Sequence, residues 1–351
     1  MTDGLIKKYK ALRTERFLGE VCARKYAFVG MGQHSLSNLY PVLDYLKVPL
    51  KYICVTSERK AALISAKFPG VTGTASLETI LKDPEVAGVF VAASPAAHFA
   101  IASKVLAAGK ALFIEKPPCS SLKELESLAE AAGNGIFEAG LQKRYAPAVR
   151  ILKKRLSVEK GLHYDLHYIT GAYPEGDTLT DLFIHPLDLA VHLFGKAEVQ
   201  CCKAAGGTMI LILEHEGGAI GTLELSTEGS WTDAEEILTV RSGKGCYRLS
   251  KMEELTFAPV PGKILGIPSE KLLHRGKTVE YLYSRNNFNP VLANNQIVSA
   301  GFFDEIHAFV AAVEDSDARS RAKAHPILSS FDDIRPTYRL LDKIAVAAND
   351  L

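Results

Sequence analysis

The sequence Phe-Ile-Glu-Lys-Pro-Pro at positions 113–118 places a lysine, Lys116, directly after a short and continuously apolar segment. Upstream, Gly30 and Gly32 follow a second apolar segment at residues 26–29. Continuously apolar strands are typical of parallel sheets that are covered on both faces. Residues that leave the carboxyl ends of such strands line the crevice in which open α/β sheets bind ligands. The two segments therefore predict a doubly wound parallel sheet with a ligand site beside Lys116.

The surrounding pattern predicts a dinucleotide-binding Rossmann domain over residues 21–144, preceded by a helical extension at residues 1–20. Apolar strands alternate with helices in this part of the chain, which implies right-handed crossovers between parallel strands. We expect strands at residues 26–29, 50–55, 86–93, 111–115 and 136–141, and helices at residues 57–68, 96–108 and from 121 onward.

The pattern changes near residue 145, after which apolar and polar residues alternate. Alternation predicts strands with one buried and one solvated face. We therefore expect residues 145–351 to form a substrate-binding and oligomerisation domain of the α+β class with an open, mainly antiparallel sheet. Residues 257–295 are irregular and polar, which is compatible with a long loop or an oligomer contact. Helices are expected at residues 179–194, 301–313 and 331–348, the last packing back on the Rossmann domain.

The composition limits the classes of partner. The 351 residues include 41 Lys plus Arg and 40 Asp plus Glu, and this net charge of +1 gives no reason to expect nucleic acid or an anionic membrane as partner. No apolar run approaches the roughly 20 residues that cross a bilayer, and residues 1–10 have no apolar signal-peptide core. The six cysteines form neither a Cys-x-x-Cys pair nor a zinc pattern. We therefore expect a cytoplasmic protein with reduced thiols and without a metal.

The glycine loop has the context of a dinucleotide site, because it follows a strand and precedes a helix. Gly30 would permit the tight turn, and Gly32 would let the backbone approach a pyrophosphate. Ser35 stands where the third glycine of the motif would fall. We expect cofactor contacts from Gly30, Gly32, Gln33, His34 and Ser35; the alternative is a tight turn without a ligand.

The end of the second strand favours NADP(H) over NAD(H). An NAD site usually has an acidic residue there, but this chain has Thr56 and Ser57, followed by Arg59. Hydroxyls beside a guanidinium would accept a 2′-phosphate, which a carboxylate would repel. The alternative is that Arg59 and Lys60 belong to a solvated helix face.

Four ionisable residues, Asp181, His185, Asp188 and His192, would form one stripe on a helix. The helix is apolar on its other sides, so the stripe is expected to face a cavity. For hydride transfer from a secondary alcohol, His185 would accept the hydroxyl proton, Asp181 would orient the imidazole, and Lys116 would stabilise the developing charge. Buried structural pairs and a metal site are the alternatives.

These motifs together resemble the Gfo/Idh/MocA family of sugar and cyclitol oxidoreductases, over residues 25 to about 345. The resemblance is carried by the glycine loop, Asp-Pro-Glu-Val at 83–86, Ala-Ser-Pro-x-x-His at 93–98, Glu-Lys-Pro at 115–117, Gln-Lys-Arg-Tyr at 142–145, and Asp-x-x-x-His-x-x-Asp at 181–188.

The resemblance implies that Lys116 and His185 are catalytic, that Asp181 assists, and that the bond between Lys116 and Pro117 is cis. It also implies a secondary alcohol or ketone of a sugar, cyclitol or sugar nucleotide as substrate, and a homodimer or homotetramer built through the C-terminal sheet. The alternatives are a nucleotide-binding regulator without turnover, and a hydrolase or lyase that uses tightly bound NAD as a transient oxidant. Ser94, Pro95, His98, Glu115 and Lys116 would contact the cofactor, and Arg144, Tyr145, Tyr168 and Asp188 the substrate.

Overall fold

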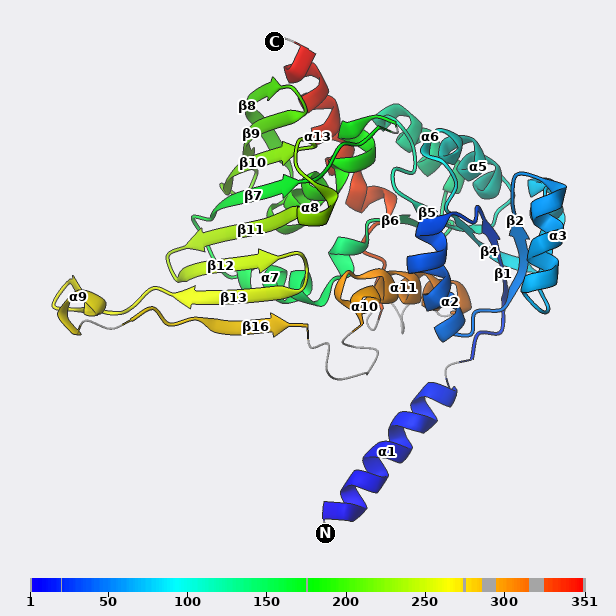
Figure 1. Ribbon diagram of the computed structural model, residues 1–351, viewed down its shortest axis with the longest axis horizontal. Helices are drawn as coiled ribbons and strands as arrows, with labels where there is room; N and C mark the ends of the chain where they lie inside the picture. Colours follow the sequence, from blue (N-terminus) through cyan, green and yellow to red (C-terminus); the bar gives the residue numbers. More distant parts are fainter. Residues whose placement is uncertain are drawn as a thin grey trace.

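The computed structural model contains two large sheets connected by helices (Figure 1). The structure describes residues 2–19, 21–174, 176–273, 276–285, 295–315 and 325–349. No helix in these ranges is both long and apolar enough to span a membrane.

The first sheet is parallel and has the order β3-β2-β1-β4-β5-β6. From β1, successive strands are added first on one side (β2, β3) and then on the other (β4, β5, β6). This switch between β1 and β4 creates the crevice where doubly wound sheets bind ligands. The expected Rossmann architecture is therefore confirmed. The strands are β1 (Lys25–Val29), β2 (Leu50–Cys54), β3 (Thr72–Thr74), β4 (Val86–Val91), β5 (Ala111–Glu115) and β6 (Phe137–Gly140).

Short helices connect these strands, and two elements had not been expected. The strand β3 and the helix α4 are short and only partly buried, so they lack the apolar run by which the other strands were recognised. The connecting helices are η1 (Ser35–Leu39), α2 (Tyr40–Tyr45), α3 (Glu58–Lys67), α4 (Leu77–Lys82), α5 (Pro95–Ala107) and α6 (Leu122–Ala132).

A helix from the end of the chain completes the core of the first sheet. The helix α11 (Phe302–Glu314) places Phe309 against Phe90 and Phe113, with ring centroids 5.1 and 5.9 Å apart. The short helix α10 (Gln296–Ser299) precedes it. Residues that are distant in sequence thus bury one face of the nucleotide sheet.

The second sheet has the order β16-β13-β12-β11-β7-β10-β9-β8. Only β7 and β10 pair in parallel, so the sheet is mixed and mainly antiparallel, as expected. Alternate residues of β7 are buried, and the other face carries polar side chains. The strands are β7 (His163–Ile169), β8 (Ala197–Ala205), β9 (Thr208–His215), β10 (Ile220–Ser226), β11 (Glu235–Ser242), β12 (Gly245–Ser250), β13 (Glu254–Pro259) and β16 (Glu280–Ser284).

Helices pack on one face of this sheet (Figure 1). The last of them, α13, also contacts the first sheet, since Phe331 stacks on Phe137 with centroids 3.6 Å apart and the Tyr338 hydroxyl donates to the Cys119 carbonyl. The expected packing of the C-terminal helix on the Rossmann domain is therefore observed. The helices are η2 (Gln142–Tyr145), α7 (Pro147–Leu156), η3 (Thr178–Leu182), α8 (Ile184–Phe194), η4 (Trp231–Asp233) and α13 (Phe331–Asn349).

Residues 257–295 are more regular than a long loop. The strand β16 pairs with β13, and between them lie β14 (Lys263–Ile264), β15 (Ile267–Pro268) and α9 (Ser269–Leu273). These elements are short and exposed. Few of their side chains are buried, so the sequence shows no regular alternation of apolar and polar residues here. Residues 286–294 fall outside the described ranges, and the oligomer contact stays a prediction.

The expected N-terminal helix is present as α1 (Thr2–Gly19), which projects away from the rest of the chain (Figure 1). Leu5 and Tyr9 on this helix are 69% and 60% exposed. The helix therefore does not bury these apolar side chains against the two sheets.

Two glutamates are buried where α11 meets the end of β6. Glu138 and Glu305 are both 0% exposed. Among the described residues their carboxyl oxygens have no partner in full hydrogen-bond geometry, although Tyr145 and the Leu141 backbone lie near enough to lower the two pKa values slightly. Burial raises the pKa of both side chains well above the ordinary value, and nearby carboxylates raise that of Glu305 further. Burial thus favours the protonated form of both carboxyls in the folded protein.

Replacing Glu305 with Gln is expected to make the free energy of unfolding less dependent on pH. Glu305 has a folded pKa above its unfolded value of about 4.3, so the unfolded chain loses this proton first and stability declines as pH rises through the interval between the two values. Urea unfolding at about pH 5 and about pH 8 should show a smaller decline for Glu305→Gln than for the wild type. Glu130→Gln, on the exposed side of α6, is the control, and equal declines for Glu305→Gln and wild type would contradict the assignment.

Candidate active site

Lys116 connects the two parts of the chain. It directly follows β5, and the Lys116–Pro117 bond is cis, as the family resemblance implied. Its ammonium Nζ donates a hydrogen bond to the main-chain carbonyl oxygen of Asp181 at 2.6 Å. Burial lowers the pKa of Lys116, while the charges of Glu115 and Asp181 act in the opposite direction. The ammonium is thus held at η3, just before α8, by a neutral acceptor.

His185 lies in the first turn of α8, four positions after the residue whose carbonyl binds Lys116. Its ring atom Nδ1 is buried without a hydrogen-bond partner in the described structure. Burial, followed by the positive charges of Lys116 and Lys143, holds the pKa of His185 well below its ordinary value. The imidazole is therefore neutral at physiological pH and available as a base.

The side chain of Asp181 does not take the position expected of it. Its carboxylate accepts hydrogen bonds from the Asp177 N–H and the Thr180 hydroxyl, both at 3.2 Å. Gly176 has a φ of +78°, and a Cβ there would lie 1.9 Å from Asp181 Oδ2. The carboxylate thus stabilises its own turn, and the expected hydrogen bond to His185 Nδ1 is not formed. Asp181 contributes its carbonyl to the site in place of its carboxylate.

Lys143 is a site residue that the sequence interpretation missed. It forms a buried ion pair with Glu236, and its ammonium lies 4.7 Å from the centre of the Tyr168 ring. Tyr168 and Glu236 are partners on the neighbouring strands β7 and β11. The charge of Lys143 also affects the pKa of Lys116 and that of His185. Lys143 is part of the Gln-Lys-Arg-Tyr motif at 142–145, but the sequence interpretation assigned substrate contacts to Arg144 and Tyr145 of that motif.

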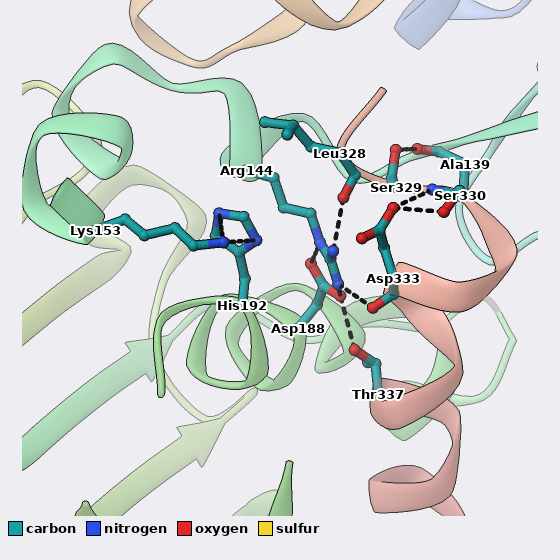
Figure 2. Close-up of polar contacts among 10 residues, drawn as sticks. All are labelled: Ala139, Arg144, Lys153, Asp188, His192, Leu328, Ser329, Ser330, Asp333 and Thr337. Atoms are coloured by element: carbon teal, nitrogen blue, oxygen red, sulfur yellow. Dashed lines mark hydrogen bonds and ion pairs between the residues drawn. The ribbon is translucent and has the colours of Figure 1, made fainter. Parts of the chain in front are cut away.

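Arg144 and Asp188 form a structural ion pair, in contrast to the expected substrate contacts (Figure 2). Arg144 donates to both carboxylate oxygens at 2.8 and 2.6 Å, and also to the carbonyl oxygens of Leu328 and Asp333. The Thr337 hydroxyl donates to Asp188 as well. With the two charged side chains 3% and 2% exposed, these bonds fasten η2 to α8 and α13.

Tyr145 and His192 contact residues other than Lys116. The Tyr145 hydroxyl accepts from the Leu328 N–H at 2.5 Å, and burial raises its pKa well above the ordinary value. His192 contacts Lys153 of α7 (Figure 2). The expected substrate role of Tyr145 is therefore not supported, and the predicted four-residue stripe divides between two places.

The glycine loop packs against the end of β4. Gly30 has a φ of +91°, and a Cβ there would lie 2.3 Å from the Ala92 carbonyl oxygen, so only glycine fits. A Cβ on Gly32 would meet no protein atom within 4 Å, which leaves room for a ligand to approach the backbone. Ser35 is buried at the start of η1, and Gln33 bonds to Ser37. His34 Nε2 lies 3.2 Å from the Glu115 carboxylate.

His98 is a clamp between two loops. Its ring is 1% exposed, with Nδ1 2.7 Å from the Pro117 carbonyl oxygen and Nε2 3.0 Å from that of Ala93. Burial lowers the pKa of His98, so the ring is neutral and its single N–H donates to one of the two carbonyl oxygens. The expected contact of this side chain with the cofactor stays a prediction. Ser94 and Pro95, at the start of α5, are exposed beside this clamp.

The end of β2 presents the residues expected to bind the adenosine ribose. The Ser57 hydroxyl oxygen caps α3 by accepting from the Lys60 N–H, and Thr56 and Arg59 are exposed. No carboxylate of the described residues therefore stands at the cap position itself, although Glu58 follows in the first turn.

The described ranges contain no group of three or more His, Cys, Asp or Glu side chains arranged to hold a metal ion. Cys119, close to Lys116 in sequence, is buried, and burial raises the pKa of its thiol to about 12. A reactive thiolate at this position is therefore not supported.

Residues 24–134 match the family model described as an oxidoreductase family with an NAD-binding Rossmann fold. Over these residues, the chain is similar to the Gfo/Idh/MocA oxidoreductase family. The matched residues include the glycine loop, the His98 clamp and Lys116. The resemblance drawn from the motifs is thereby confirmed.

Two curated relatives have similar sequences. The chain is 32% identical over 180 residues to the putative oxidoreductase YceM of Salmonella typhimurium, covering 47% of this chain and 57% of the relative. It is 28% identical over 210 residues to D-xylose dehydrogenase of Paenarthrobacter nicotinovorans, covering 50% and 54%. The chain thus spans little more than half the length of these relatives.

A levoglucosan dehydrogenase in complex with NADH and levoglucosan has a similar fold. The TM-score is 0.74 at 17% identity, with 93% of this chain and 97% of the other covered. At this identity, the similarity establishes the fold alone.

Replacing His98 with Leu is expected to lower the free energy of unfolding by about 1–3 kcal/mol, because the carbonyl that accepts from the ring N–H loses its buried donor. His98→Asn, which keeps one donor, should lose less, and Ser94→Ala is the control in the same loop. Urea unfolding measures the difference. A Leu variant as stable as the wild type would show that the clamp does not hold these loops.

Proposed function

We propose that this protein is an NAD(P)-dependent dehydrogenase or reductase that acts on a secondary alcohol or ketone of a sugar, cyclitol or sugar nucleotide. The observation that carries the proposal is the buried Lys116 ammonium, held by the Asp181 carbonyl beside a neutral His185. The family match supports the nucleotide, and the similarity to D-xylose dehydrogenase supports a polyol substrate.

The nicotinamide supplies the hydride acceptor or donor, and the glycine loop, Ser94 and Pro95 would line its site. In the direction of oxidation, His185 accepts the proton of the substrate hydroxyl. Lys116 donates a hydrogen bond to the same oxygen and stabilises the charge that develops on it. In the direction of reduction, the imidazolium returns the proton to the oxygen.

The group formed by Lys143, Tyr168 and Glu236 would bind the other hydroxyls of the substrate. The ammonium can donate and the carboxylate can accept, so a polyol would satisfy both. The cation and the ring of Tyr168 are already in contact, which limits the freedom of the ammonium before the substrate arrives.

We further propose NADP(H) as the preferred cofactor. The Ser57 hydroxyl caps α3 as an acceptor and keeps its own proton for donation to a 2′-phosphate. Arg59 and Lys60 are exposed in the first turn of the same helix, whose N-terminus favours anions. The open face of the second sheet is the proposed surface for a homodimer or homotetramer (Figure 1).

Replacing Lys116 with Ala is expected to lower kcat by about 10²- to 10⁴-fold, since the substrate oxygen loses its cationic partner. Cofactor affinity should change less than about threefold, a small effect in free energy. Lys104→Ala, on the exposed side of α5, is the control. Steady-state turnover of a polyol panel and cofactor fluorescence provide the two measurements. Unchanged turnover of an accepted substrate would reject the mechanism, and turnover without net cofactor consumption would favour the transient-oxidant alternative.

Replacing Arg59 with Ala is expected to weaken NADPH binding about tenfold, equivalent to about 1.4 kcal/mol, and to leave NADH binding almost unchanged. The reason is that only NADPH carries the 2′-phosphate that the guanidinium would contact. Titration of both cofactors into wild type, Arg59→Ala and Lys67→Ala checks this, with Lys67 at the far end of α3 as the control. Tighter binding of NADH than of NADPH by the wild type would overturn the preference.

A further inference from the structure

A cavity lies between α7, α8 and α11, and neither Lys116 nor His185 lines it. Its volume is about 360 Å³, within the usual range for sites of small molecules. The apolar part of its wall includes Ala308, Pro326 and Leu328. The charged part consists of Arg144, Arg150, Lys153, Lys154 and Asp304, together with His192 and His325.

Most of these charges are positive and only some are compensated. Arg144 is paired with Asp188, and Arg150 lies 3.2 Å from Asp304. Lys153 and Lys154 have no carboxylate partner in the part of the chain that the structure describes. The cavity wall therefore carries two uncompensated ammonium groups.

Lys153 is directed toward the cavity by a histidine that cannot neutralise it. Its Nζ lies 3.3 Å from both ring nitrogens of His192 (Figure 2). Burial, followed by the charges of Arg144 and Lys153, lowers the pKa of His192 to about 2. The imidazole is therefore a neutral acceptor, and it fixes the ammonium without cancelling its charge.

We propose that this cavity binds a small molecule carrying a phosphate monoester, with the dianion between Lys153 and Lys154 and the organic part against Ala308, Pro326 and Leu328. Two unpaired ammonium groups match the charge of a phosphate dianion. A cavity of this size has room for more than the phosphate group, and its apolar wall would contact the organic part of the ligand.

The cavity is separate from the proposed catalytic centre but shares its helix. His192 lies two turns beyond His185 on α8, and the buried Arg144–Asp188 pair stands between the cavity and the rest of the molecule. A bound phosphate compound would thus contact the same rigid helix that positions the proposed base. The proposal does not depend on the proposed function, because its test measures binding alone.

The test is a calorimetric titration of the full chain with inorganic phosphate and with glycerol 3-phosphate. The wild type should bind both saturably, glycerol 3-phosphate at least as tightly as phosphate. Lys153→Gln/Lys154→Gln should weaken both affinities at least about tenfold, whereas Lys160→Gln, an exposed lysine just beyond α7, should not. Potassium chloride at matched ionic strength controls for screening.

Three results would overturn the proposal. The wild type could fail to bind either probe, or the double variant could bind both as well as the wild type, which would place the phosphate elsewhere, for example at the glycine loop. Weaker binding of glycerol 3-phosphate than of phosphate would contradict the proposal that the cavity holds an organic group beside the phosphate. Circular dichroism of the double variant establishes that any lost binding is not lost folding.

Discussion

The hydrogen bond from Lys116 Nζ to the Asp181 carbonyl is the interaction on which the site depends. It joins a loop of the nucleotide sheet to η3, the turn that directly precedes the helix that carries His185. Because the acceptor is a main-chain atom, its position is set by the turn and not by a side-chain rotamer. The His98 clamp fixes the lysine loop, and the Gly176–Asp181 turn fixes the carbonyl. Two independently braced loops thus meet at one ammonium group.

A second constraint holds the helices around this meeting point. The Arg144–Asp188 pair is buried and fully hydrogen-bonded, and removing one partner of such a pair typically costs about 3–5 kcal/mol. It connects η2, which carries Lys143, to α8, which carries His185, and to α13. Arg144 and Asp188 thereby help to set the positions of Lys143 and His185, although neither is shown in contact with them. A charged residue in a motif beside a site can therefore position the helices of that site without binding the ligand.

The sequence was sufficient for the parallel sheet, the glycine loop and the Lys116 loop, because each depends on local pattern. It was insufficient for Lys143, whose role depends on Tyr168 and Glu236 meeting across β7 and β11. Register between strands distant in sequence leaves no local signal. Arg144, Asp188 and His98 are polar residues predicted to contact ligands, and in the structure each is buried against protein partners that the sequence did not indicate. The short strands β3 and β16 lack an apolar run because none of their side chains is fully buried.

The missing contact between the Asp181 carboxylate and His185 has a specific backbone cause. Residues at i, i+4, i+7 and i+11 share a face only when the helix is regular throughout. Here Thr178–Leu182 form a π-turn, and Phe183 interrupts the helix before α8 begins at Ile184. A π-turn is wider than an α-turn, so the side chain of Asp181 no longer lies above that of His185. The Asp181 carbonyl at this irregular turn is the acceptor that Lys116 uses.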